Sequence, residues 1–107
     1  MASVRAKALD RLFRALAGAP RREILRLAAR QKCAVTHFVD QLDLRQPAVL
    51  KHVRVLVDAA LLTKSRDGRY RWCRLRRSAF EPARESIEEL CETVPLTSQR
   101  RGTQARR

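Results

Sequence analysis

The side chains that could do chemistry in this chain are mainly cations, and they are densest in residues 45–77. Within that block Gln46, Leu50 and Arg54 stand at i, i+4 and i+8, so on a helix they share one face. Glutamine can pair with adenine and arginine with guanine or phosphate, while the leucine either touches a thymine methyl group or only shields the helix. The residues expected to contact phosphates flank this row or follow it: Arg45, Lys51, His52, Lys64, Arg66, Arg69 and Arg71. The block predicts a surface that reads base edges.

The distribution of charge supports a polyanionic partner. The 107 residues carry a formal net charge of +13, from 24 Lys+Arg against 11 Asp+Glu. The net charge is +5 over residues 1–44, +8 over 45–77, −4 over 78–95 and +4 over 96–107. A strongly basic block followed by an acidic one indicates one binding face and a different role elsewhere. A merely solvated strand surface stays open as the alternative for each basic residue near the hairpin.

Three cysteines are a weaker candidate for chemistry, because their odd number does not suit the disulfide framework of a secreted protein. Cys33, Cys73 and Cys91 are either inert or form a thiol switch that acts by disulfide formation or by capture of arsenite. We expect Cys33 to open a helix and be exposed. Cys73 is either a small apolar residue on the inward face of a strand or a reactive thiol whose pKa is lowered by Arg71 and Arg74. Cys91 is expected beside a dimer contact.

Other kinds of chemistry are not indicated. The cysteines and histidines lack the spacing of a metal site, and no cofactor is expected. Nothing resembles a nucleophile with its base, and three glycines in total argue against a loop that cradles phosphates, so an enzyme is not predicted. Apolar runs stay well below 18 residues and the N-terminal stretch is not a signal peptide, which predicts a cytoplasmic protein.

Two helices are predicted before residue 31. Apolar residues at helical spacing predict the first helix over about 5–17: Leu9, Leu12, Phe13 and Leu16. Gly18 is expected to end this helix with a positive φ. Pro20 suits the first turn of a second helix that runs to about Arg30 and buries Ile24, Leu25 and Ala28.

A helix-turn-helix is predicted next. Thr36 is a good N-cap for a short third helix, and Pro47 fits the opening turn of a fourth helix that ends near Ala60. Val49 and Val53 belong to the apolar face of the fourth helix, opposite the row that begins at Gln46. The second helix of such a unit is narrow enough to enter the major groove.

A hairpin and one more helix complete the predicted fold. Asp67-Gly68 between strand-like residues predicts a type I′ turn, and this hairpin would form a wing beside the helix-turn-helix. The last helix begins near Ser78 and ends before Pro95. Its apolar residues, with those of the first helix, are expected to form a homodimer interface, an ordinary internal core being the alternative: Leu9, Leu12, Phe13, Leu16, Phe80, Ile87, Leu90 and Val94. We therefore expect a DNA-binding and dimerisation domain over residues 1–95 and a flexible basic tail over 96–107.

Three strings of the sequence resemble the ArsR-type (ArsR/SmtB) winged helix-turn-helix transcription regulators of bacteria. Family strings of the form ALADPTRRxIL, LPAVSKHLKVLxxAGLI and WRPCRL are matched, with substitutions, by Ala15–Leu25, Gln46–Leu62 and Trp72–Leu75. The match covers about residues 9–90. The resemblance implies a mainly α fold with a small β-hairpin, in the order α-α-α-α-β-β-α. It also implies a homodimeric repressor that binds double-stranded DNA at an inverted-repeat operator and leaves it when a signal arrives.

The chain is most similar to the subgroup of this family that lacks metal sites. Arsenic- and zinc-sensing members carry Cys-x-Cys on the third helix, where this chain has Ala34 and Thr36, or Asp and His residues on the last helix, which here has no histidine. A thiol-sensing repressor remains one alternative. An alternative of another class is a basic structural nucleic-acid-binding protein without operator specificity.

Overall fold

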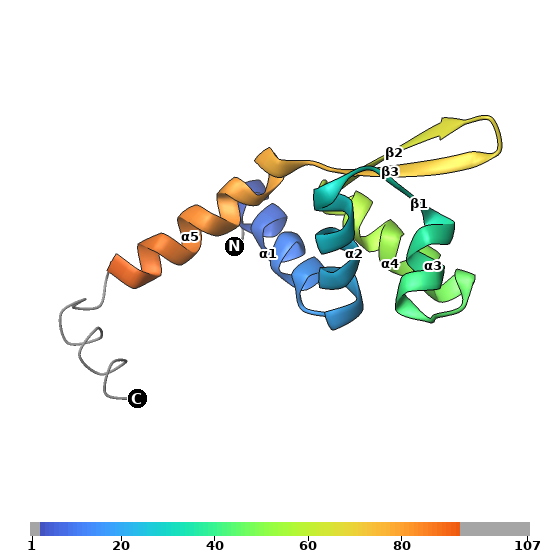
Figure 1. The fold of residues 1–107 in the computed structure, drawn as a ribbon. Coiled ribbons are helices and arrows are strands. Elements are labelled where there is room, and N and C mark those ends of the chain that lie inside the picture. Colours follow the sequence, from blue (N-terminus) through green and yellow to red (C-terminus); the bar gives the residue numbers. More distant parts are fainter. Residues whose placement is uncertain (1–2, 93–107) are drawn as a thin grey trace.

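Residues 3–92 are described by the computed structural model, in which helices pack beneath a small antiparallel sheet (Figure 1). The elements are α1 Val4–Leu16, α2 Ala19–Arg30, β1 Cys33–Ala34, α3 Val35–Leu42, α4 Gln46–Asp58, β2 Leu62–Asp67, β3 Tyr70–Leu75, the 3₁₀ turn η1 Arg77–Phe80, and α5 Glu81–Glu92. The predicted winged helix-turn-helix is confirmed, and the short strand β1 is an addition to it. Val94 and the predicted tail over 96–107 lie outside the described residues.

The corner between α1 and α2 is closed by arginine side chains. Arg21 donates from Nε to the carbonyl oxygen of Ala15 (2.9 Å) and from Nη2 to that of Arg14 (3.1 Å). Arg22 donates from Nη1 to the carbonyl oxygen of Leu16 (2.8 Å). The predicted positive φ at Gly18 is wrong, because its φ is −102°. Since guanidinium groups satisfy the last carbonyls of α1, the corner needs no left-handed residue.

The short strand β1 changes the start of α3. Cys33 pairs with Cys73 and Ala34 with Trp72, both across to β3. The extended residue Ala34 is therefore the N-cap of α3, and no side chain caps this end. The prediction that Thr36 is the N-cap is wrong, because Thr36 already lies inside the first turn of the helix.

The three strands run in the order β1-β3-β2, and β2 with β3 forms the wing, residues 62–75. Asp67 pairs with Tyr70, so the two central residues of the turn are Gly68 and Arg69. Of these, Gly68 has a positive φ of 63° and Arg69 does not. The predicted type I′ turn centred on Asp67 and Gly68 is therefore wrong, and the backbone matches the type II′ pattern, which places glycine first.

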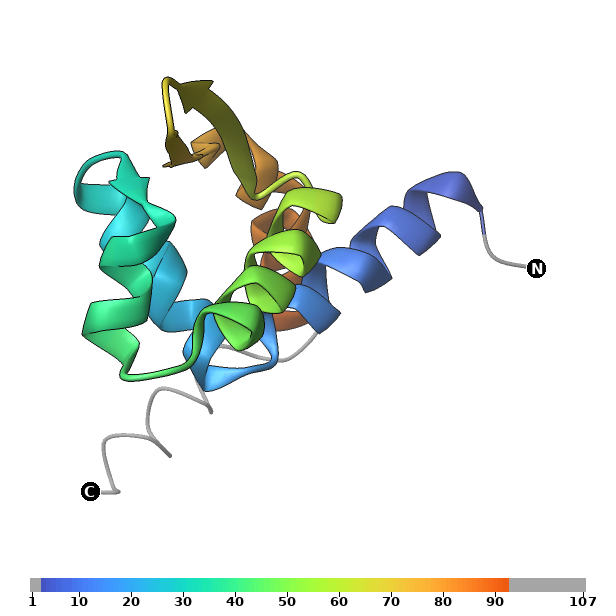
Figure 2. The same cartoon turned by 90° about the vertical axis from the view of Figure 1, so that its right-hand side faces the viewer.

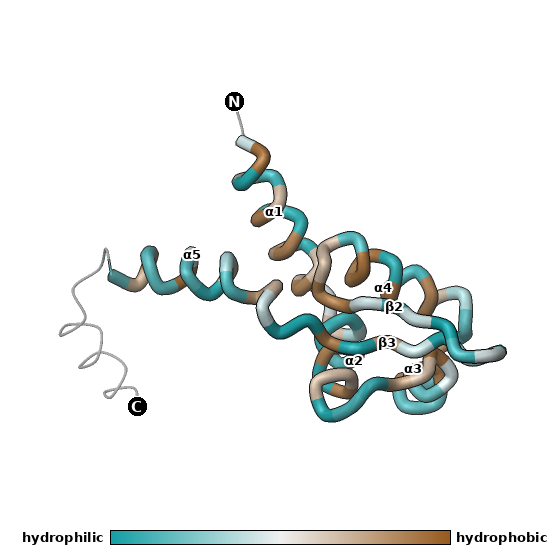
Figure 3. The backbone as a smooth tube through the Cα atoms, turned by 90° about the horizontal axis from the view of Figure 1, so that it is seen from above, coloured by the Kyte–Doolittle hydropathy of each residue, from teal (hydrophilic) through white to brown (hydrophobic). Residues whose placement is uncertain are grey.

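The core lies between the sheet and the helices and positions the wing over α3 and α4 (Figure 2). Its largest fully buried side chains come from α2, α3, α4, the wing and the residue before it: Phe38, Ile24, Leu56, Leu61, Leu62, Val49, Val53 and Cys73. Each buried aliphatic or aromatic side chain of this size stabilises the fold by about 1.5–3 kcal/mol. Figure 3 shows hydrophobic positions along α4 and at the start of β2, and Leu56 and Leu62 of these elements belong to the core.

The end of α4 contains a left-handed residue that is not glycine. Ala60 has a φ of 65°, its N–H donates to the carbonyl of Val57 (2.9 Å), and the N–H of Leu61 donates to that of Leu56 (2.9 Å). These are the two hydrogen bonds of a Schellman motif, in which glycine is the usual left-handed residue.

We expect Ala60→Gly to raise the free energy of unfolding by about 1 kcal/mol, because a left-handed alanine is strained by roughly that amount. Urea denaturation followed by circular dichroism measures this change. Ala59→Gly is the matched control, since Ala59 has a φ of −87° and should gain nothing from glycine. Equal effects of the two substitutions would contradict the prediction.

Candidate nucleic-acid interface

The turn between α3 and α4 takes three residues and presents the start of α4 at the surface. Asp43 adopts a left-handed conformation (φ 54°, ψ 46°), which aspartate tolerates better than most residues, and its N–H donates to the carbonyl of Val39 (3.1 Å). Arg45 is extended, and its carbonyl accepts the N–H groups of Ala48 and Val49. The predicted helix-turn-helix is thus present, with Pro47 in the first turn of α4.

The two faces of α4 differ as the periodicity predicts. Val49, Val53 and Leu56 are fully buried. On the other side lies the reading row, which we define as Gln46, Leu50 and Arg54; the first and last are exposed, and Leu50 is half-buried against the edge of the core. A helix of 10–12 Å diameter matches a major groove about 12 Å wide. The exposed side of α4, with the reading row on it, therefore fits the width of the major groove of a duplex.

A cavity of about 240 Å³, which we call the hollow, joins the reading row to the wing. Gln46 and Leu50 line it from α4, and Arg69, Tyr70 and Arg71 line it from the wing. The structure therefore brings four of the predicted site residues together on one surface. Two guanidinium groups beside a glutamine can hold a sugar–phosphate strand while the amide meets a base.

The wing concentrates positive charge, and its cations form no ion pair within the described part of the chain. Arg66 and Arg71 are direct partners across β2 and β3, and Lys64 stands opposite Cys73. The ion pairs among residues 3–92 join Glu23 to Arg26 and Arg84 to Glu88, so neither reaches the wing. Like charges that face each other across strands are destabilising, and a bound phosphate group relieves this repulsion.

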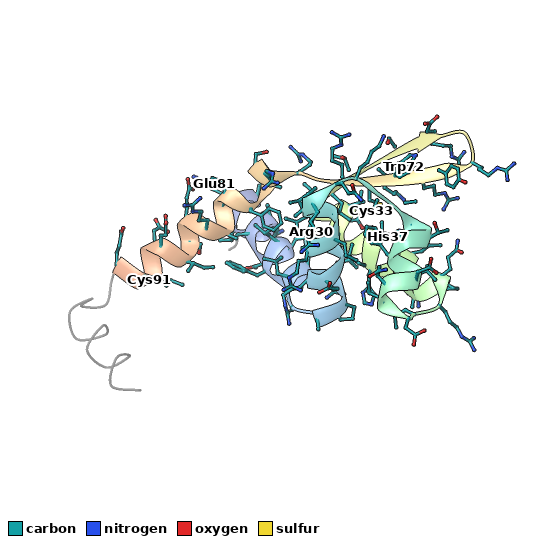
Figure 4. The ribbon with its side chains drawn as sticks, in the orientation of Figure 1. Arg30, Cys33, His37, Trp72, Glu81 and Cys91 are labelled. Carbon is teal, nitrogen blue, oxygen red and sulfur yellow. The ribbon has the colours of Figure 1, made fainter. Side chains whose placement is uncertain are left out.

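Two aromatic side chains of β3 were not predicted as part of the site. The ring centroid of Trp72, which Figure 4 labels, lies 5.9 Å from that of Tyr70 and 5.0 Å from Lys32 Nζ. Trp72 Nε1 is shielded from water and has no hydrogen-bond partner among the described residues. Lys32 reaches this place because β1 pairs with β3, and a strand of two residues has no periodicity that the sequence could reveal.

His52 contacts α2 instead of the hollow. Its Nδ1 lies 3.4 Å from Arg21 Nη1, a contact between residues 31 positions apart. Burial, and then the positive charge of Arg21, lower the pKa of His52 below 6.5, so the ring is neutral at pH 7. Arg21 was missed as a functional candidate. Arg45, Lys51 and Arg54 are exposed on or beside the first three turns of α4, as expected for residues that meet phosphates or bases.

Two predictions about the cysteines are wrong. Cys33 is buried in β1, where its Sγ donates to the carbonyls of Gln31 (3.3 Å) and Leu27 (3.6 Å), and it is not an exposed start of a helix. Burial raises the pKa of Cys33, and raises that of Cys73 to about 11 with Lys64 opposing the effect. Arg71 and Arg74 therefore do not lower it, and the alternative, a small apolar residue on the inward strand face, is confirmed by the complete burial of Cys73. Both groups are thiols at neutral pH, which makes them poor nucleophiles and ligands.

The residues predicted for a dimer interface divide into two groups. Leu12 is buried in the core, and Leu9, Leu16 and Phe80 are half-buried against it. Phe13, Ile87 and Leu90 are 36%, 51% and 66% exposed on α1 and α5, which lie together at the side of the molecule away from the wing (Figure 1). Cys91 is exposed near the end of α5 (Figure 4). A single chain thus leaves part of the predicted interface uncovered.

The described residues contain neither a metal-binding cluster nor a membrane-spanning helix. Within residues 3–92 no three or more His, Cys, Asp or Glu side chains gather in a way that could hold a metal ion. The helices of the same stretch include none with the length and apolar character needed to cross a bilayer.

Comparisons with known proteins give matches to solved structures, whereas no family model and no curated protein matches the chain. The crystal structure of an ArsR family transcriptional regulator is similar over 87% of this chain and 95% of that one, with a TM-score of 0.78 and 27% identity. An ArsR-like transcriptional regulator from Rhodococcus sp. RHA1 has a TM-score of 0.71 and 21% identity, over 91% of this chain and 89% of that one. The transcriptional repressor BigR from Xylella fastidiosa has a TM-score of 0.62 and 18% identity, over 74% and 83%. All three matches extend over most of both chains.

Proposed function

Because the chain belongs to the ArsR family of winged helix-turn-helix transcriptional regulators, we propose that it is a dimeric repressor that binds an inverted-repeat operator in the bacterial cytoplasm. Regulators of this family bind DNA and are not enzymes. The observation that carries the proposal is the hollow, where Gln46 and Leu50 of α4 meet Arg69 and Arg71 of the wing.

The residues of this surface have different roles in the proposal. Gln46 and Arg54 meet base edges in the major groove, and Leu50 lies between them against a thymine methyl group or as a shield of the helix. The neutral His52 and six cations hold the phosphate backbone on either side and carry no sequence information of their own; the cations are Arg45, Lys51, Lys64, Arg66, Arg69 and Arg71.

Homodimerisation supplies the spacing that an operator needs. Two copies of α4 must reach successive major grooves, which are about 34–36 Å apart on one side of the duplex. The exposed apolar residues Phe13, Ile87 and Leu90 support an interface built from α1 and α5 of both copies. Two identical halves related by a two-fold axis then require an imperfectly palindromic site.

The experiment that tests this function is a selection followed by competition. Duplexes bound by the full chain are selected from a random library, and the best one is then challenged with a large excess of bulk DNA. A repressor keeps one short palindromic duplex, because its specific affinity exceeds its non-specific affinity by at least 10³. Exchange of the duplex for bulk DNA would instead identify a structural nucleic-acid-binding protein.

Arg54→Ala and Lys64→Ala should separate base contacts from phosphate contacts. We expect Arg54→Ala to cost about 1–3 kcal/mol on the selected duplex and to relax its base preference at one position of each half-site. Lys64→Ala should weaken all duplexes alike and reduce the salt slope by about one for each protomer. Fluorescence anisotropy on the selected duplex and on point-substituted duplexes measures both. Equal, sequence-blind losses from the two changes would contradict the assignment of α4 as the reading helix.

The alternative function within the same family is a repressor that senses an oxidant or arsenite through a cysteine. The burial of Cys33 and Cys73 and their raised pKa values argue against both as the first thiol to react with an oxidant or arsenite. Cys91 is exposed and is the accessible candidate among the described residues. The proposed repressor function does not depend on any of the three.

A further inference from the structure

Arg21 connects three helices through one guanidinium group. Its Nε and Nη2 donate to the carbonyls of Ala15 and Arg14 at the end of α1, while its own backbone belongs to α2. Its Nη1 lies 3.4 Å from Nδ1 of His52 on α4. The group thus joins a helix of the proposed dimer interface to the helix that carries the reading row.

The contact defines the state of the His52 ring. An arginine side chain has donors and no acceptor, so the Nδ1 that faces it must be unprotonated. A neutral imidazole with an unprotonated Nδ1 carries its proton on Nε2 and offers that N–H as a donor. Among the described residues, Arg21 is the charged group whose field acts on this ring, and the neighbouring cations Lys51 and Arg54 are exposed on the same helix.

We propose that Arg21 is a positioning residue for DNA binding, because it holds α4 against the end of α1 and keeps His52 in the tautomer whose Nε2–H donates to a backbone phosphate. This inference rests on the proposed DNA-binding function. It adds a residue of α2 to the interface, although Arg21 itself makes no contact with DNA in the proposal.

Arg22 distinguishes this role from ordinary capping. It also donates to the end of α1, at the carbonyl of Leu16, but among the described residues its guanidinium group has no hydrogen bond to α4. Arg22 is exposed, whereas Arg21 is half-buried between α1 and α4. Arg22→Gln therefore removes the same charge and a similar hydrogen bond to the end of α1, but it leaves the contact between Arg21 and His52 in place. This makes it a matched control.

The experiment compares Arg21→Gln with Arg22→Gln on the selected duplex by fluorescence anisotropy, with unfolding curves of both variants as a check on stability. At pH 7.5 we expect Arg21→Gln to weaken binding about three- to tenfold, the size of one net hydrogen bond, and Arg22→Gln to change it less than twofold. In a double-mutant cycle with His52→Leu, the double variant should bind no more weakly than His52→Leu alone, because both changes remove the contact between Arg21 and residue 52.

The pH profile gives a readout that capping alone does not move. Loss of Arg21 removes one of the two causes that lower the pKa of His52, so this pKa rises in Arg21→Gln. As the pH falls from 7.5 to 6.0, more of its His52 becomes protonated and can pair with a phosphate. Arg21→Gln should then recover about twofold in affinity relative to the wild type, and Arg21→Gln/His52→Gln should not.

Several results would overturn the inference. Equal losses for Arg21→Gln and Arg22→Gln, additive losses in the cycle, or pH profiles that match the wild type would each reduce Arg21 to a cap of α1. If Arg21→Gln does not fold, two substitutions at His52 carry the test. His52→Leu should lose affinity for the duplex, whereas His52→Gln should retain part of it because its side-chain amide can still donate a hydrogen bond. A wild-type chain that selects no duplex would instead refute the proposed function.

Discussion

Raising the monovalent salt concentration from 50 to 200 mM is expected to weaken operator binding by roughly 10³–10⁵. The reason is the number of cations at the proposed interface, which we expect to engage about 6–10 phosphates over the two protomers. Each neutralised phosphate releases condensed counterions, so the logarithm of the affinity falls linearly with the logarithm of the salt concentration. Anisotropy titrations at five salt concentrations measure the slope.

The control for this prediction removes a cation that lies far from the proposed interface. Arg84 is exposed on α5, and its Nε lies 3.8 Å from Oε2 of Glu88. This acidic helix lies away from the wing (Figure 1). Arg84→Ala should leave the slope unchanged, whereas Lys64→Ala should reduce it. A wild-type slope equivalent to only one or two phosphates would contradict the proposed basic surface.

Placing charge on the exposed apolar side of α5 is expected to abolish the homodimer and to reduce operator affinity about 10²–10⁴-fold. In the variant Ile87→Glu/Leu90→Glu, two side chains that are more than half exposed in one chain would have to bury carboxylates in the proposed interface. The separated monomers then bind half-sites independently and lose the high effective concentration that linkage provides. Sedimentation velocity at micromolar protein measures the assembly state, and anisotropy measures the affinity.

A matched control keeps the change in charge and moves it off the apolar side. Arg84→Glu alters the net charge of α5 by the same amount as the double substitution, at an exposed position beside Glu88. This variant should remain a dimer. A double variant that stays dimeric would refute the proposed interface, and a wild-type chain that is a monomer without preference among duplexes would refute the proposed dimeric repressor.

The helices and the hairpin could be predicted because each depends on local signals. Pro20 and Pro47 lie in the first turns of α2 and α4, and the apolar spacing of Val49, Val53 and Leu56 defines the buried side of α4. The same spacing placed Gln46, Leu50 and Arg54 on the opposite side. The reading row therefore follows from helical periodicity alone.

Contacts between distant segments could not be predicted in this way. Cys33 was placed at an exposed helix start because a two-residue strand that pairs only with β3 leaves no pattern in the sequence. The cap of α1 by Arg21 and Arg22 replaces the left-handed glycine that Gly18 led us to expect. The contact of Arg21 with His52 spans 31 positions, and only the packing of α2 on α4 brings the two together.

The pairing of β1 with β3 has a mechanical consequence for regulation. Residues 33–34 lie directly before α3, and their ladder to Cys73 and Trp72 couples the helix-turn-helix to the base of the hairpin. Hinge motion between those two parts would break the backbone hydrogen bonds between β1 and β3 and would open the apolar core around Phe38 and Cys73. We therefore expect the two parts to move together. In the proposed dimer, a signal that releases the operator would then act by changing the separation or tilt of two such units across the two-fold axis.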